Sequence, residues 1–242
     1  MSTSISELKY RDGDLDLTGV FAVKEQMTQK RPGILVVHGG AGLDEHAKRR
    51  ARRFADAGFV AFACDMYGTG VAGDRQRVMA TIMELSKDAA KLRRRVSAGL
   101  ATLRSHPLVD GRVAAVGYCF GGLTVLELAR SSADVLGVTS VHGSLHTLQP
   151  AQPGGVTAKI LVCHGGRDPH VPMSQVDAFV EEMKSAAVDF QLIVYGLAMH
   201  GFTHEGSPAT PGVQYDALTD ARSEQAIQAF LAEIFDFAGS AY

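Results

Sequence analysis

From Gly33 onward, short apolar runs alternate with stretches of helical patterning, and this alternation limits the possible folds more than any other feature of the sequence. The apolar runs predict strands at Ile34–Val37, Val60–Ala63, Val113–Val116, Val135–Val141, Ile160–Cys163 and Phe190–Tyr195. The patterned stretches predict helices at Asp44–Ala57, Arg75–Arg104, Leu123–Arg130, Met173–Ala186 and Asp216–Phe235. Such alternation requires a mainly parallel sheet with helices on both faces. The sequence therefore predicts an α/β fold.

Two local signals refine this prediction. The stretch Arg75–Arg104 is too long for a typical globular helix, and Ser86 followed by Asp88 has the character of a cap that divides it in two. Near the start of the chain, Leu8–Tyr10 and Leu15–Val23 flank Asp12-Gly13, which predicts an antiparallel hairpin with a tight turn. No linker, repeat or low-complexity segment interrupts the pattern, so residues 1–242 are predicted to form a single domain.

Charge and composition argue against several classes of protein. A formal net charge of −2 gives no overall attraction to nucleic acid. No apolar run approaches the roughly 18 residues of a membrane span, and the first residues carry no basic leader followed by an apolar stretch. We therefore expect a cytoplasmic protein with neither a nucleic-acid nor a membrane partner.

The cysteines must each be judged by their surroundings. There are three, with no paired spacing, which argues against a disulfide framework and a structural zinc site. Cys64 and Cys163 lie in or at the ends of apolar strands, and we expect both to be buried and inert. Cys119 lies in a different setting, in a glycine-rich turn.

That turn, Gly117-Tyr118-Cys119-Phe120-Gly121-Gly122, falls between a predicted strand and a predicted helix. In this context it is typical of the nucleophile elbow of α/β-hydrolases, a strained turn with the nucleophile at its centre. Side chains two positions before and after the nucleophile would collide with the neighbouring strand and helix, so glycines are needed there. The pattern predicts Cys119 as a nucleophile.

A cysteine nucleophile needs a base to form the thiolate, and the base needs a third group to orient it. In α/β-hydrolases these follow in the order nucleophile, acid, histidine. Asp168 follows the strand Ile160–Cys163, and His200 follows the strand Phe190–Tyr195. Alone, such an acid could cap a helix and such a histidine could be incidental. Together with the elbow, at strand ends where open α/β sheets place their sites, they predict a catalytic triad.

Ester hydrolysis also requires hydrogen-bond donors for the oxyanion. The predicted donors are the backbone N–H groups of Phe120, directly after the nucleophile, and of Gly40, in the loop His38–Gly42. A phosphate-binding loop is the rival interpretation of these glycines, but the lysine and the Ser or Thr that would follow them are missing.

His200 and His204 have the i, i+4 spacing of a metal-binding pair on a helix. Gly201 indicates a loop there, and no clustered third ligand is evident, so we expect neither a metal nor another cofactor. His142, His146 and His204 are predicted instead to line the substrate pocket.

Over nearly its whole length the chain resembles the dienelactone hydrolase family. The resemblance lies in Cys64–Gly68, Gly117–Gly122, Gly166–Pro172 and His200–Phe202. It implies a cysteine hydrolase without a cofactor, with Cys119, His200 and Asp168 as its triad. It also implies a shallow site with no large cap domain.

Two departures from the family bear on the substrate. The best-known members carry a glutamate where this chain has Gly39, and an arginine where it has His204. Arg77 is the candidate for a second arginine with which those members hold a substrate carboxylate. Because a buried carboxylate without its arginine is costly, the departures predict a preference for neutral, fairly bulky esters.

We therefore expect a hydrolase, a monomer or homodimer, that cleaves small-molecule esters or lactones through a thioester acyl-enzyme. Two alternatives remain open. The same nucleophile and oxyanion donors suit attack on the phosphorus of an uncharged phosphotriester, as a main or a side activity. The chain could also be a non-catalytic binding protein on a hydrolase scaffold.

Overall fold

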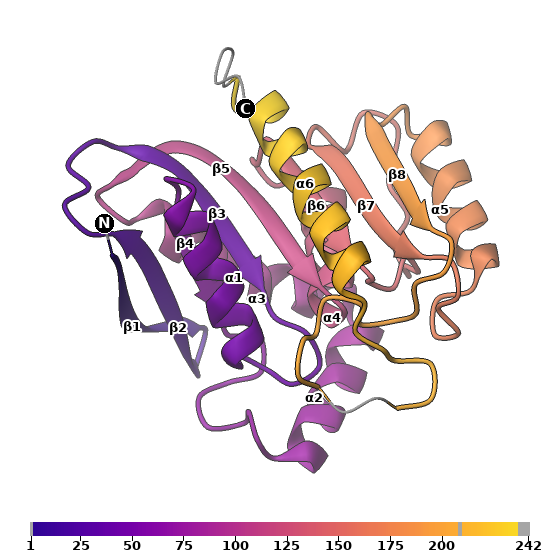
Figure 1. Cartoon of the computed structure of the whole chain (residues 1–242), viewed down its shortest axis with the longest axis horizontal. Helices are drawn as coiled ribbons and strands as arrows, with labels where there is room; N and C mark the ends of the chain where they lie inside the picture. Colours follow the sequence, from indigo (N-terminus) through magenta and orange to yellow (C-terminus); the bar gives the residue numbers. More distant parts are fainter. Residues whose placement is uncertain (1, 208–209, 237–242) are drawn as a thin grey trace.

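The computed structural model describes residues 2–207 and 210–236. Across these residues eight strands form one sheet in the order β1-β2-β4-β3-β5-β6-β7-β8 (Figure 1). The strands are β1 Thr3–Asp12, β2 Leu15–Lys24, β3 Arg31–Val37, β4 Val60–Cys64, β5 Val109–Tyr118, β6 Gly137–Val141, β7 Lys159–Gly165 and β8 Phe190–Tyr195. The helices are α1 Glu45–Asp56, α2 Arg75–Lys87, α3 Ala89–Arg104, α4 Phe120–Arg130, α5 Met173–Ser185 and α6 Ala217–Ile234.

Strands β3 to β8 pair in parallel, whereas β2 is antiparallel to both β1 and β4. The α/β prediction with an N-terminal hairpin is confirmed. Because β3 and β5 are neighbours, the loops after Val37 and after Tyr118 emerge side by side at the carboxyl edge of the sheet. This edge is where an open parallel sheet places its functional residues.

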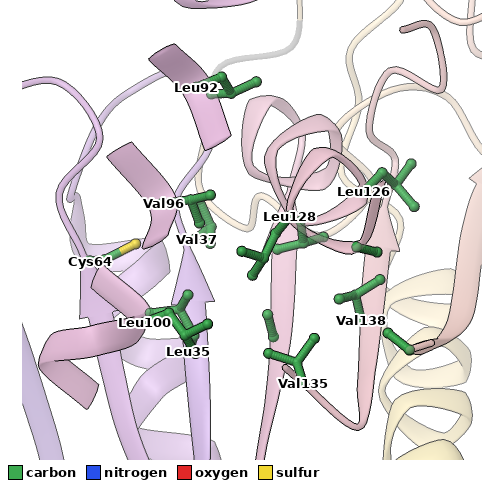
Figure 2. Close-up of a cluster of buried hydrophobic side chains, with 14 of the residues drawn as sticks. Leu35, Val37, Cys64, Leu92, Val96, Leu100, Leu126, Leu128, Val135 and Val138 are labelled. Atoms are coloured by element: carbon green, nitrogen blue, oxygen red, sulfur yellow. The ribbon is translucent and has the colours of Figure 1, made fainter. Parts of the chain in front are cut away.

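The helices cover both faces of the sheet. Helices α2, α3, α4 and α5 pack on one face, and α1 and α6 pack on the other. Figure 2 shows part of the first layer, in which Val96 of α3 lies beside Val37 of β3 and Leu100 beside Leu35. Strand residues buried on both faces explain why the central strands read as continuous apolar runs rather than alternating ones.

The predicted division of the stretch from Arg75 to Arg104 is confirmed. Asp88 ends α2 and caps α3, where its carboxylate accepts a hydrogen bond from the Lys91 backbone N–H at 2.9 Å. The carboxylate satisfies one of the N–H groups that a helix start leaves without a partner.

Two elements lie a few residues from their predicted positions. The hairpin turn consists of Gly13 and Asp14, with φ +60° at Gly13, while Asp12 pairs with Leu15 in the ladder. Helix α4 begins at Phe120 rather than Leu123, because the chain enters the helix directly from the strained residue before it.

Candidate active site

Cys119 sits in the sharp turn between β5 and α4, with φ +54° and ψ −116°. Residues other than glycine rarely adopt this conformation, and it persists only where the surroundings impose it. A Cβ atom at Gly117 would overlap the Gly121 carbonyl, and one at Gly121 would overlap the Val37 carbonyl. The structure therefore explains why glycines flank Cys119 and why its side chain projects from the turn.

The structure brings the three predicted triad residues together. His200 Nε2 lies 3.1 Å from Cys119 Sγ, and His200 Nδ1 lies 2.7 Å from Asp168 Oδ2. The other oxygen, Oδ1, accepts the backbone N–H groups of His170 and Val171 at 2.8 and 3.1 Å. Both oxygens of the buried carboxylate are thus engaged, which fixes the plane of the His200 ring.

The electrostatics favour a thiolate paired with an imidazolium. Burial alone would lower the pKa of His200, but its hydrogen bonds to Asp168 and Cys119 raise the pKa to about 10. Burial alone would raise the pKa of the Cys119 thiol, but the hydrogen bond and charge of His200 outweigh it and lower the pKa. Opposite charges at hydrogen-bond distance stabilise each other's charged form.

Two backbone N–H groups also act on the thiol of Cys119. They belong to Gly40 and Phe120, the two residues predicted as oxyanion donors, and their hydrogen bonds help to lower the pKa of the thiol. Gly40 lies in the loop after β3 and Phe120 opens α4, so neighbouring strands supply the two donors. Donors converging on the nucleophile are placed to bind an oxygen that becomes negative during attack.

A series of hydrogen bonds supports the Gly40 loop from below. His38 Nε2 accepts the Met66 backbone N–H at 3.0 Å, so Nδ1 carries the proton and donates to the Gly39 carbonyl at 2.8 Å. The Met66 carbonyl in turn accepts from Arg95 Nη1 at 2.9 Å. Arg95 Nε donates to Asp12 Oδ2 at 2.6 Å, which links the N-terminal hairpin to the loop.

Of the four residues predicted to line the pocket or bind substrate, His142 and His204 lie beside the triad, whereas His146 is exposed and lines a separate groove with Leu148. The ring centroid of His142 is 5.4 Å from that of His200 and 5.2 Å from that of His204. Arg77 lies elsewhere: its guanidinium is exposed, donates to the Gly70 carbonyl at 3.1 Å, and lines a surface groove with Lys9. The expected arginine is not brought to Cys119, because the first turn of α2 directs it toward the Gly70 loop.

The sequence analysis did not identify three residues next to the rings of His142 and His204, namely His46, Thr203 and Arg50. The His46 ring stacks on that of His204, with centroids 4.2 Å and planes 26° apart. Thr203 Oγ1 lies 3.1 Å from His46 Nε2 and 2.8 Å from His142 Nε2. Arg50, buried in an ion pair with Asp220, donates to His46 Nε2 at 3.3 Å. No local pattern could have revealed these contacts, since α1 and the His204 loop are distant in sequence.

The other two cysteines are buried, as expected. Burial raises the pKa of both Cys64 and Cys163, the latter to about 12. Within residues 2–207 and 210–236, no group of three or more His, Cys, Asp or Glu side chains is arranged to hold a metal ion. No helix in the described part of the chain has the length and apolar character needed to cross a bilayer.

A mainly parallel sheet with a strained strand-turn-helix elbow, followed by an acid and a histidine at later strand ends, defines an α/β-hydrolase. Comparison with known proteins places the chain more narrowly. It belongs to the dienelactone hydrolase family, whose family model matches residues 17–235.

Curated relatives and solved structures agree with this assignment. An uncharacterized protein of Caenorhabditis elegans is 41% identical over 155 residues, covering 60% of this chain and 95% of that protein. A putative carboxymethylenebutenolidase of Methylorubrum extorquens is 28% identical over 191 residues, covering 74% of this chain and 65% of the relative. The crystal structure of a dienelactone hydrolase-like promiscuous phosphotriesterase from metagenomic libraries superimposes with a TM-score of 0.90 at 38% identity, covering 97% and 99% of the two chains. The chain is therefore a hydrolase.

Proposed function

We propose that this hydrolase cleaves carboxylic esters or lactones through a covalent thioester on Cys119. The thiolate attacks the carbonyl carbon, and the N–H groups of Gly40 and Phe120 donate to the oxygen that becomes negative. His200 protonates the leaving alkoxide as the carbon–oxygen bond breaks. The neutral His200 then takes a proton from water, and the resulting hydroxide displaces the sulfur as thiolate. Asp168 keeps the ring oriented throughout.

One observation carries this proposal: His200 Nε2 lies 3.1 Å from the sulfur of Cys119, and the backbone N–H groups of Gly40 and Phe120 help to lower the pKa of that thiol. An inert buried cysteine needs none of these groups. A binding protein on a hydrolase scaffold would have no use for a thiol whose pKa is lowered, so the geometry favours catalysis over that alternative.

The test is turnover of p-nitrophenyl acetate by the Cys119→Ala variant, with Cys163→Ala as the matched control at a buried cysteine. We expect Cys119→Ala to lose activity and Cys163→Ala to keep it. Intact-mass measurement of the wild-type protein, quenched during turnover, should show one added acetyl group, and none in Cys119→Ala. Full activity of Cys119→Ala would exclude the mechanism.

The surroundings of Cys119 favour neutral substrates. A Cβ at Gly39 would lie 3.3 Å from both Cys119 Cβ and His204 Nε2, so the position of the family glutamate adjoins the nucleophile and carries no side chain here. Burial lowers the pKa of His204, which keeps the residue at the family arginine position uncharged at neutral pH. The fixed positive charge that would pair with a substrate carboxylate is therefore absent at position 204.

Phosphotriester hydrolysis is a second candidate activity. The phosphotriesterase that superimposes over 97% of this chain at 38% identity is the observation that favours it. Attack of Cys119 on phosphorus would release the leaving group and form a sulfur–phosphorus bond that water must then cleave. Incubation with paraoxon tests this candidate: release of more than one equivalent of p-nitrophenol supports it, and release of one equivalent or less excludes it.

A further inference from the structure

His204 presents a hydrogen-bond acceptor to the space beside the nucleophile. Nδ1 is the ring nitrogen on the side of Gly201, 3.4 Å from the position that a Gly201 Cβ would occupy, and the Gly201 backbone acts on the ring to raise its pKa. In the neutral tautomer that has its proton on Nδ1, Nε2 carries the lone pair. Nε2 is on the opposite side of the ring, toward Gly39. It lies 3.3 Å from the position that a Gly39 Cβ would occupy, and that position is also 3.3 Å from Cys119 Cβ.

The surroundings hold this ring in place and neutral. Burial is the largest influence lowering the pKa of His204, and the charges of His200 and Arg50 lower it further, against an opposing attraction from Asp44. The ring stacked on it, His46, has a pKa lowered to about 2 by burial, by His204 itself and by Arg50. The remaining neighbour, His142, has its pKa lowered well below the ordinary value, first by burial. His204 is thus a neutral base held within a cluster of neutral rings.

The protonation of His200 after the first step depends on the leaving group. A basic alkoxide takes the proton from His200, which is then neutral and free to activate water. A weakly basic group such as p-nitrophenolate departs as an anion and takes no proton. His200 then begins the second step as an imidazolium beside Asp168, which favours its charged form, and it cannot act as a base while it keeps that proton.

We propose that His204 Nε2 is a second general base, which activates water when the leaving group departs without the His200 proton. This inference rests on the proposed function. His204 takes one proton from water, and the hydroxide oxygen bonds to the acyl carbon or to the phosphorus. The bond to Cys119 breaks, and its electron pair returns to the sulfur as thiolate beside the His200 imidazolium. His204 then releases its proton to solvent.

Two substrates that form the same butyryl thioester isolate this step: p-nitrophenyl butyrate and ethyl butyrate. In His204→Phe, which keeps a ring to stack on His46, steady-state turnover of the aryl ester should fall by roughly 10²-fold or more. A burst of one equivalent of p-nitrophenol should precede the slow phase. Turnover of ethyl butyrate should fall much less, so that the ratio of the two rates changes by roughly tenfold or more. His146→Phe, at an exposed histidine, is the matched control and should leave both rates unchanged.

His204→Gln provides a second readout, should the phenylalanine disturb folding. A base must be neutral, so wild-type turnover of the aryl ester should fall as the pH drops through the lowered pKa of His204, and His204→Gln should lose this dependence. An equal loss on both substrates would mean a structural role and overturn the inference, as would unchanged rates on both. Failure of the underlying function looks different: no burst and no acyl group on Cys119.

Discussion

The Asp168 carboxylate joins the His200 ring to the backbone of the loop that follows β7. One oxygen accepts from His200 Nδ1 at 2.7 Å, and the other accepts the backbone N–H groups of His170 and Val171. The ring that faces the nucleophile is therefore tied to rigid backbone through a single side chain. The charge of that side chain also supports the imidazolium form of His200.

Replacing Asp168 by Asn should remove this charge while keeping the shape of the side chain. We expect kcat/KM for p-nitrophenyl acetate to fall by about 10³–10⁴-fold, because the ring loses both its orientation and the support for its charged form. Asp177→Asn, at an exposed position on α5, is the control and should match the wild type. A variant at Asp168 that retained more than a tenth of the activity would contradict this role.

The reactivity of Cys119 should follow a pH profile set by its lowered pKa. Thiolate forms as the pH rises through that pKa. Alkylation by iodoacetamide should therefore reach half its plateau rate at a pH below about 8.5, the ordinary pKa of a cysteine. Peptide mapping should find the label on Cys119, because Cys64 and Cys163 are buried. A half-rise at or above the ordinary value would show that the thiol is not activated.

Hydrolysis of alkyl esters should decline at high pH for a separate reason. His200 must be protonated to give a proton to the leaving alkoxide, and its pKa is raised to about 10. Activity should therefore persist while the pH is below that value and be lost as the pH rises through it. The measurement is kcat/KM for ethyl butyrate in a pH-stat. A decline centred near the ordinary histidine pKa of about 6.5 would contradict the ion pair of His200 with Cys119.

Gly121, two positions after the nucleophile, should be required for stability. A Cβ at Gly121 would overlap the Val37 carbonyl, so Gly121→Ala should lower the free energy of unfolding by about 1–3 kcal/mol or prevent folding. Gly196→Ala is the matched control, because a Cβ there meets no atom of the described residues within 4 Å. Thermal unfolding followed by circular dichroism distinguishes the two. Equal melting temperatures for both variants would argue against this packing of the elbow.

Charge at position 204 should control the choice between neutral and anionic substrates. The wild type should prefer the methyl ester of a carboxylate-bearing lactone over the free acid, since burial of an unpaired carboxylate is unfavourable. His204→Arg should shift kcat/KM toward the acid by about tenfold, equivalent to about 1.4 kcal/mol. A wild-type preference for the free acid would refute the argument.

Much of the fold could be predicted from the sequence because its signals are local. The βα alternation and the cap at Asp88 depend on residues close together in the chain, and both are confirmed. The elbow could be recognised because close backbone contacts around this one turn leave room only for glycine at the flanking positions. The proximity of Cys119, Asp168 and His200 followed from strand order, since all three lie after the carboxyl ends of parallel strands.

The direction in which individual side chains point could not be predicted from the sequence. Arg77 was expected beside the substrate, but the side chain turns to Gly70 instead, and no pattern along α2 distinguishes the two outcomes. The stack of His46 on His204 joins a helix start to a loop 158 positions further along, with no shared motif. Such contacts depend on how loops and helices fold over the sheet edge, which residue spacing does not encode.

The chain of hydrogen bonds from Asp12 through Arg95, Met66 and His38 to Gly39 makes the hairpin part of the catalytic apparatus. A refolding chain whose parallel strands have paired before this hairpin docks on the sheet does not yet have these hydrogen bonds. Until it docks, the loop that carries Gly40 lacks its support. Recovery of esterase activity should therefore lag behind recovery of helical signal, which would make catalysis a reporter of the last tertiary contacts to form.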